Sequence, residues 1–272
     1  MIDLTTPSAR RAELSGAGAL ILLLLGFALW YMATHEAPRP YGSQEPAETV
    51  PEPVLPHIIE EHEQYYDIEA TYPGETPLKA SAGAAADAEA VSAMERFVED
   101  TIAEFRAQGN FENLTPEDIQ IMGLSDTRKE SLVMGYEEQI GTHTVSYAYT
   151  LHMDTLGAHP NTFFRTFTFD LESGEELEIG DLFLPRSDYL KRLSAIAEFE
   201  LSKSLGEFVD IEYIRQGTGP EAINFQSFAI DGTNLVLLFP PYQVAPYAAG
   251  AQTVSIPLEQ LRDILRPEYA PE

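Results

Sequence analysis

The 272-residue chain contains no cysteine. Disulfides, thiol nucleophiles and thiolate metal sites are therefore excluded, although the lack of cysteine says little about the compartment. Basic residues are also few, with 16 Lys and Arg against 44 Asp and Glu, and the formal net charge is −28. Such a surface repels nucleic acid and attracts cationic partners, so we expect no nucleic-acid partner. An acidic, soluble envelope protein explains the charge equally well.

Catalytic motifs are missing as well. The sequence has no GxSxG elbow, no HExxH pair and no glycine-rich phosphate loop. Its six histidines supply few general acids or bases, and a pair of carboxylates proves nothing where carboxylates are so abundant. We therefore predict that the protein is not an enzyme, with no catalytic residue, no metal site and no cofactor.

One long stretch carries no charge. Ala17 to Ala33 reads AGALILLLLGFALWYMA, which covers about 25 Å as a helix and can be extended by its neighbours toward the ~30 Å hydrocarbon core. Arg10 and Arg11 precede it, so residues 1–16 are expected to form a short cytoplasmic tail. A cleaved signal peptide is the alternative, but the run ends in residues that fit a cleavage site poorly. We expect a single-pass anchor in the cell (inner) membrane with the C-terminal part periplasmic.

Residues 34–56 are rich in proline and glutamate, a composition that favours an extended linker over a packed core. An amphipathic helix is predicted beyond it, because apolar residues recur at three- and four-residue spacing. These residues are Val91, Met94, Val98, Ile102 and Phe105.

Alternating apolar and polar residues predict strands from Val145 to Met153 and from Phe163 to Leu171. A second amphipathic helix is expected from Leu190 to Leu201. Strand clusters broken by single helices, without regular βαβ alternation, predict an α+β fold with mostly antiparallel sheets and packed helices.

A hairpin is predicted near the C-terminus, where Asp-Gly-Thr-Asn separates the apolar runs Phe228 to Ile230 and Leu235 to Phe239. Two prolines then end the second strand. Another strand follows, and Pro257 is expected to open a terminal helix.

The segment FPPYQVAPYAAG at 239–250, followed by VSIPL at 254–258, resembles the C-terminal domain of RsiV-type anti-sigma factors. GAHPN at 157–161, with FDLESG and LEIGDLF at 169–174 and 177–183, is similar to the start of that domain. The region from about residue 67 to 153 resembles more loosely the small domain found at the start of PdaC-type peptidoglycan deacetylases.

The resemblance implies a deacetylase-associated-like small domain at 57–156 and an RsiV-like C-terminal domain at 157–272. In the best-known members of the family the latter is extracytoplasmic and binds lysozyme. Only about sixteen residues precede the predicted span, too few for the family's sigma-binding segment, so anti-sigma activity is not expected. We expect a membrane-anchored extracytoplasmic binding protein that senses or inhibits lysozyme or a similar cationic envelope ligand. The alternative is an enzyme or enzyme accessory acting on peptidoglycan.

Residue types indicate where a lysozyme-like cationic protein or a cell-wall component binds. Tyrosine offers a large contact area with few rotatable bonds, and proline holds a loop in its bound shape beforehand. The candidate partner-binding residues are Pro240, Pro241, Tyr242, Gln243, Pro246 and Tyr247, with Gly157, His159 and Asn161 beside them. The alternative is that the tyrosines pack on the sheet and only stabilise the turn. For His159 a hydrogen bond within its own loop is preferred to catalysis, because no partner nucleophile can be named.

Overall fold

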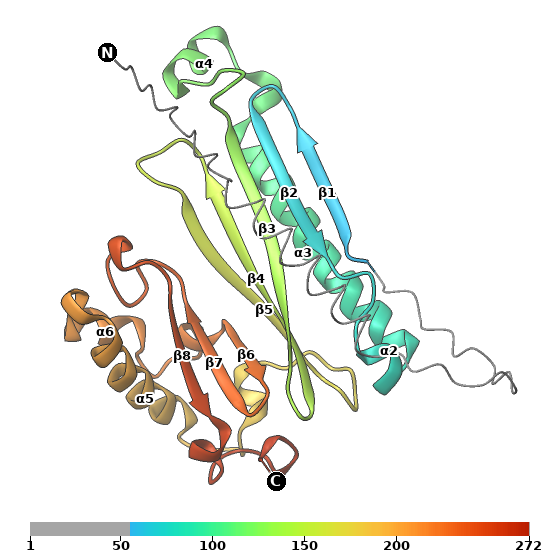
Figure 1. Cartoon of the computed structure of the whole chain (residues 1–272), viewed down its shortest axis with the longest axis vertical. Coiled ribbons are helices and arrows are strands. Elements are labelled where there is room, and N and C mark those ends of the chain that lie inside the picture. Colours follow the sequence, from blue (N-terminus) through green and yellow to red (C-terminus); the bar gives the residue numbers. More distant parts are fainter. Residues whose placement is uncertain (1–54, 272) are drawn as a thin grey trace, which may run out of the picture. The chain divides into compact units, whose positions relative to one another are not determined.

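The computed structural model describes residues 55–271 (Figure 1). The predicted cytoplasmic tail, the anchor at Ala17–Ala33 and nearly all of the linker lie outside these residues. Within residues 55–271 no helix has both the length and the apolar character needed to cross a membrane.

The N-terminal half of the described chain builds a five-stranded sheet in the order β1-β2-β3-β4-β5. Its strands are β1 (His57–His62), β2 (Tyr66–Tyr72), β3 (Glu130–Ile140), β4 (Thr144–Asp154) and β5 (Asn161–Asp170). Neighbouring strands run antiparallel except β2 and β3, which are parallel. The crossover between β2 and β3 contains α2 (Leu78–Ser81), α3 (Ala84–Gly109) and α4 (Pro116–Met122). The α+β prediction is confirmed, but this sheet is mixed.

Helix α3 provides the core of the five-stranded sheet and lies along it in Figure 1. Four of its predicted apolar residues are buried, whereas the fifth, Val91, is half-buried. Their partners on the sheet include Leu132, Tyr147 and Phe167. The helix ends where Asn110 adopts the left-handed conformation at φ 47°. The predicted buried stripe is therefore confirmed.

The C-terminal half builds a three-stranded antiparallel sheet of β6 (Phe228–Asp231), β7 (Asn234–Phe239) and β8 (Gln252–Pro257). The predicted hairpin is confirmed, and Gly232 supplies its turn with a φ of 57°. Helix α5 (Tyr189–Ser204) buries Leu193, Ala197 and Leu201 in the core of this sheet, and the short α6 (Ile211–Gly217) packs beside α5.

Short 3₁₀ helices connect these elements. They are η1 (Phe111–Asn113), η2 (Ile179–Leu182), η3 (Gly206–Phe208), η4 (Ala222–Phe225), η5 (Tyr247–Ala249), η6 (Leu258–Leu261) and η7 (Pro267–Tyr269).

The predicted terminal helix at Pro257 is wrong. Pro257 is extended, with ψ 127°, and closes β8; the short 3₁₀ helix η6 follows it in place of an α-helix. The Leu258 amide donates to the Thr233 carbonyl at 2.9 Å, which ties the chain to the β6–β7 turn. Leu258 and Leu261 are both buried, and their three-residue spacing suits a 3₁₀ turn.

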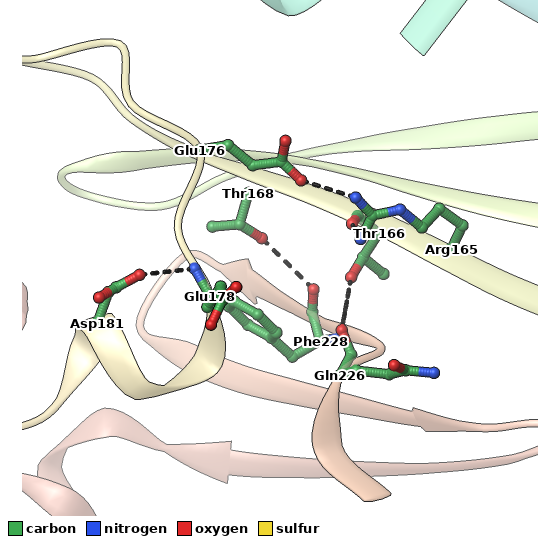
Figure 2. Close-up of polar contacts among 8 residues, drawn as sticks. All are labelled: Arg165, Thr166, Thr168, Glu176, Glu178, Asp181, Gln226 and Phe228. Atoms are coloured by element: carbon green, nitrogen blue, oxygen red, sulfur yellow. Dashed lines mark hydrogen bonds and ion pairs between the residues drawn. The ribbon is translucent and has the colours of Figure 1, made fainter. Parts of the chain in front are cut away.

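Each sheet has its own apolar cluster, and between them lie three buried hydroxyl groups. We call Ser146, Thr166 and Thr168 the hydroxyl seam; all are at most 3% exposed. The Ile230 amide donates to Ser146 Oγ and the Phe228 amide to Thr166 Oγ1, both at 3.0 Å. Figure 2 shows Thr168 Oγ1 directed at the Phe228 carbonyl. The face of the large sheet thus supplies side-chain partners for the outer backbone edge of β6.

The predicted domain boundary between residues 156 and 157 falls in the turn that joins β4 to β5, which are neighbours in one sheet. The buried Phe167 and Phe169 of β5 belong to the apolar cluster of that sheet. The boundary itself stays a prediction.

Candidate functional site

Three aromatic rings from two distant loops meet in the structure. His159 lies in the turn between β4 and β5, Tyr242 follows β7, and Tyr247 begins η5. The His159 and Tyr247 rings stack with centroids 3.6 Å apart and planes 16° apart. Tyr242 lies 5.7 Å from Tyr247 and 5.9 Å from His159, again between centroids. We call His159, Tyr242 and Tyr247 the aromatic cluster.

The polar atoms of the cluster form a consistent hydrogen-bond network. His159 Nδ1 lies 3.0 Å from the Pro160 carbonyl, which can only accept, so this nitrogen carries the proton. His159 Nε2 is then an acceptor, and the Tyr242 hydroxyl at 2.9 Å donates to it. The Tyr247 hydroxyl also donates to the Pro160 carbonyl, at 3.0 Å. The predicted hydrogen bond of His159 within its own loop is present, and the ring also joins that loop to Tyr242.

Tyr242 has a costly backbone conformation. Its φ is 72°, in a region that costs a non-glycine residue about 1–2 kcal/mol. Contacts on both sides hold it there, since the Tyr213 hydroxyl donates to the Tyr242 carbonyl at 3.0 Å and the Gln243 amide donates to Pro240 at 3.1 Å. The Tyr242 side chain is nevertheless 52% exposed. The protein therefore fixes an exposed aromatic side chain at an energetic cost.

Gln243 anchors this turn from inside. Its Nε2 donates to the Gly217 and Asn224 carbonyls, each at 3.0 Å. A Cβ atom at Gly217 would lie 1.9 Å from the Gln243 carbonyl oxygen, so the end of α6 and the turn pack in backbone contact. The Gln243 side chain is thus engaged within the protein and fixes the turn that carries Tyr242.

The remaining candidate residues surround the cluster with different exposure. Pro246 and Gly157 are exposed, whereas Pro240, Pro241 and Asn161 are half-buried. Val244 and Ala245, between the two tyrosines, are buried in the core of the three-stranded sheet. The turn is therefore rooted in the core while Tyr242 projects outward.

Sequence reasoning did not identify Tyr213, although it holds Tyr242 in place. Its hydroxyl contacts a backbone carbonyl 29 positions away. Any residue presents a carbonyl, so such a contact leaves no side-chain pattern in the sequence.

No group of three or more His, Asp or Glu residues within the described part of the chain could hold a metal ion. His62 Nδ1 lies 3.1 Å from Asp67 Oδ1, and Lys129 Nζ lies at the same distance from that oxygen. Burial raises the pKa of Asp67, but the hydrogen bonds from Lys129 and His62 outweigh it and hold this pKa below its ordinary value. The arrangement is that of a local ion pair.

Comparison with known proteins relates this architecture to one domain family. Residues 180–259 match the family described as "Protein of unknown function (DUF3298)". A solved structure of a DUF3298 member from Bacteroides fragilis NCTC 9343 has the same fold, with a TM-score of 0.50 and 17% identity. The match between the two covers 79% of this chain and 95% of the Bacteroides fragilis chain.

Sequence similarity to curated proteins extends beyond residues 180–259. The chain is 32% identical over 179 residues to peptidoglycan-N-acetylmuramic acid deacetylase PdaC of Bacillus subtilis 168, covering 65% of the chain and 36% of PdaC. Immunogenic protein MPT64 of Mycobacterium tuberculosis H37Rv is 28% identical over 109 residues, which cover 40% of the chain and 46% of MPT64. Esterase Rv3036c of the same strain is 27% identical over 114 residues, which cover 42% of the chain and 49% of the esterase.

The chain spans less than half the length of each of these three relatives. The expected relationship to PdaC is confirmed over that span, and the expected relationship to RsiV-type proteins holds at the level of a domain found in both groups. The chain thus carries a DUF3298 domain and is homologous to PdaC over 65% of its length.

Proposed function

We propose that this chain is a membrane-anchored extracytoplasmic binding protein that recognises lysozyme or a similar cationic envelope protein through its aromatic cluster. One observation carries the proposal. Tyr242 is half-exposed and holds a φ of 72° through contacts from Tyr213 and His159. Strained conformations that are fixed by their surroundings concentrate at functional sites.

The chemistry of the cluster suits a protein partner. Exposed tyrosines are common at the energetic centres of interfaces, and a turn already fixed in its bound shape loses little entropy on docking. The net charge of −28 adds long-range attraction for a cationic protein. Contact at the cluster then accounts for affinity, and the acidic surface accounts for rapid encounter.

Substitution at Tyr242 tests this function by calorimetry with hen egg-white lysozyme. Tyr242→Ala should weaken binding by about 2 kcal/mol or more. Tyr242→Gly should weaken it equally while relieving the backbone cost, so lost binding is separated from lost folding. Ile121→Ala, at a 75%-exposed residue of α4, is the matched control and should bind like the parent chain.

Added salt should slow association without removing the effect of Tyr242→Ala. If the parent chain binds no lysozyme even at low ionic strength, the proposed partner is wrong. If Tyr242→Ala loses stability but keeps its affinity, the cluster is only a structural support for the turn.

The proposed anchor has a separate test. A tag at the N-terminus should be protected from protease in intact cells, while one after Glu272 should become accessible once any outer membrane is permeabilised. Release of a mature form that begins near Thr34 or later would contradict the anchor.

The alternative function is an enzyme or enzyme accessory acting on peptidoglycan. The observation that favours it is the 32% identity to PdaC, whose name specifies peptidoglycan deacetylation. A deacetylation assay and a sedimentation assay with purified peptidoglycan test it. Activity, or peptidoglycan binding that survives Tyr242→Ala, would favour this alternative over lysozyme recognition.

A further inference from the structure

The outer edge of β5 is paired at one end only. The Leu177 amide donates to the Thr168 carbonyl at 2.7 Å, and the Asp170 amide donates to the Glu175 carbonyl at 3.0 Å. Residues 175–177 thus act as a short sixth strand beside the end of β5. The chain then turns into η2 at Ile179 and leaves the rest of the edge without a backbone partner in the described chain.

Backbone groups alternate in direction along a strand, so Phe164 and Thr166 point outward as Thr168 does. Their carbonyls confirm the direction: Arg165 Nη1 donates to the Thr166 carbonyl at 2.9 Å, and Ser227 Oγ lies 3.4 Å from the Phe164 carbonyl. The amides of Phe164 and Thr166 have no hydrogen-bond partner anywhere in residues 55–271. The edge therefore offers two unused donors.

A cavity of about 550 Å³ opens where the pairing stops. Its lining residues include Arg165, Thr166, Glu176, Glu178, Ile223 and Gln226. In Figure 2 the Thr166 side chain turns toward Gln226, and Arg165 reaches Glu176. This volume lies within the range of about 300–1,000 Å³ that is typical of ligand pockets.

The charges at the cavity favour a cation. Arg165 pairs with Glu176 at 2.8 Å and lies 4.3 Å above the centre of the Phe167 ring, which fixes the guanidinium. Glu178 adds a second carboxylate, so the lining carries one positive and two negative charges. The net charge of −28 also opposes the approach of a second copy of this chain.

We propose that an extended segment of a cationic protein adds as a strand to the unpaired part of the β5 edge and places a basic side chain in the cavity beside Glu178. Main-chain hydrogen bonds to Phe164 and Thr166 give such a complex its affinity, and the cavity gives it specificity. This proposal deepens the proposed function and rests on it for the cationic character of the partner. In the free protein the Arg165 guanidinium occupies the Thr166 carbonyl, so the added strand displaces it.

N-methylated peptides test the strand geometry. The probe is the blocked hexapeptide acetyl-Val-Lys-Val-Lys-Val-Lys-amide, with one derivative methylated at the three valine amides and another at the three lysine amides. Alternate amides of a strand face the same neighbour, so only one derivative places its methyl groups against the edge of β5, where they prevent the close approach that the hydrogen bonds from Phe164 and Thr166 need. That derivative should bind at least about tenfold more weakly than the parent peptide and the other nearly as well. Equal binding of the two derivatives would overturn the proposal.

Amide NMR locates the contact. The parent peptide should slow hydrogen exchange at the Phe164 and Thr166 amides and leave the amides of β1 unchanged. Glu178→Gln should weaken the peptide severalfold, whereas Glu172→Gln, in the exposed turn after β5, is the matched control. Protection of the Thr166 amide by chitotetraose and not by the peptide would show that the edge binds glycan, and the proposal would fail.

The outcome at the edge is separable from the outcome at the aromatic cluster. If lysozyme binds in a Tyr242-dependent way while the two methylated peptides bind equally, the strand proposal fails and the proposed function stands. If one methylated peptide loses affinity and lysozyme does not bind, the edge is a peptide site and the lysozyme assignment fails.

Discussion

The five-stranded and three-stranded sheets bury different kinds of core. Both bury phenylalanines, but the first also packs the fully buried Tyr147 and Tyr149 against α3, whereas the buried residues of the second, within residues 55–271, are mainly Leu, Ile and Val and include no tyrosine. The Tyr147 hydroxyl donates to Glu138 at 2.7 Å, but the Tyr149 hydroxyl is buried without a partner in the described chain. Burial raises the pKa of both tyrosines above the ordinary value. The first core thus tolerates polar atoms that the second lacks.

The contact between the two sheets differs from both cores, because it includes buried hydroxyl groups that bind backbone amides. The hydroxyl seam satisfies backbone groups of β6, so polar and directional contacts join two regions that have separate cores. Directional contacts fix orientation, which undirected apolar packing does less strictly. The seam therefore helps to bring the His159 loop, which follows β4, within reach of Tyr242, which follows β7.

A cavity in the second core should produce the largest effect and test whether the two cores are independent. Leu193 of α5 is fully buried, so Leu193→Ala should lower the free energy of unfolding by about 2–5 kcal/mol. Hydrogen exchange should show a larger loss of protection in α5 and β7 than in β4. The exposed control Ile121→Ala should change stability by less than about 0.5 kcal/mol. Equal losses in β4 and β7 would mean that both sheets unfold as one unit.

Removal of a hydroxyl group from the hydroxyl seam should have the second-largest effect on stability. Thr166→Val keeps the shape of the side chain and removes the acceptor of the buried Phe228 amide, which should cost about 1–3 kcal/mol in urea denaturation. Thr71→Val is the control, because Thr71 is half-buried in β2 and its hydroxyl has no hydrogen-bond partner in residues 55–271. If both variants lose the same stability, the seam contributes nothing specific.

The hydroxyl seam also shows which features the apolar pattern of the sequence can predict and which it cannot. Periodicity predicted α3, α5, β4, β5 and the hairpin, because each has one apolar face. The same alternation places Thr166 and Thr168 on a polar face, yet both are buried, since β6 supplies backbone partners that no local pattern encodes. The parallel pairing of β2 with β3 is hidden for a similar reason, because a long crossover separates the two strands.

The residue types of the candidate site could be predicted from the sequence, but the contacts between these residues could not. Tyr242, Tyr247 and His159 could be selected because such residues favour binding loops, and the structure brings all three together. Their mutual geometry depends on the placement of two loops 83 positions apart. The positive φ of Tyr242 was not foreseeable, because tyrosine rarely adopts it.

Removal of the ring that joins the two loops should have a moderate effect. His159→Ala deletes the contacts to Tyr242, Tyr247 and Pro160, and should lower the free energy of unfolding by about 1 kcal/mol without changing metal content. Urea denaturation and elemental analysis measure the two quantities. His143→Ala, at an exposed residue of the β3–β4 turn, is the control. Stoichiometric metal that disappears in His159→Ala would show that this histidine is a ligand.

The smallest effect is expected at a pH-dependent contact between the two regions, where the Tyr269 hydroxyl donates to Asp170 Oδ2 at 3.0 Å. Burial raises the pKa of Asp170, but hydrogen bonds from Ser173, Tyr269 and the Glu172 amide outweigh it, so this pKa lies below its ordinary value. A depressed carboxyl pKa stabilises the fold above the unfolded-state pKa of about 3.9, and this stability is lost as the pH falls through the folded-state pKa.

Tyr269→Phe removes one of these donors. We expect a loss of up to about 1 kcal/mol at pH 7 that shrinks as the pH falls through the lowered folded-state pKa of Asp170. Urea denaturation at pH 7 and at an acidic pH where Asp170 is protonated measures it. Tyr213→Phe is the matched control, because its hydroxyl donates to the Tyr242 carbonyl, which does not titrate over this range. Its loss should therefore be the same at both pH values, and a pH-independent loss in Tyr269→Phe would contradict the assignment of Asp170 as the titrating partner.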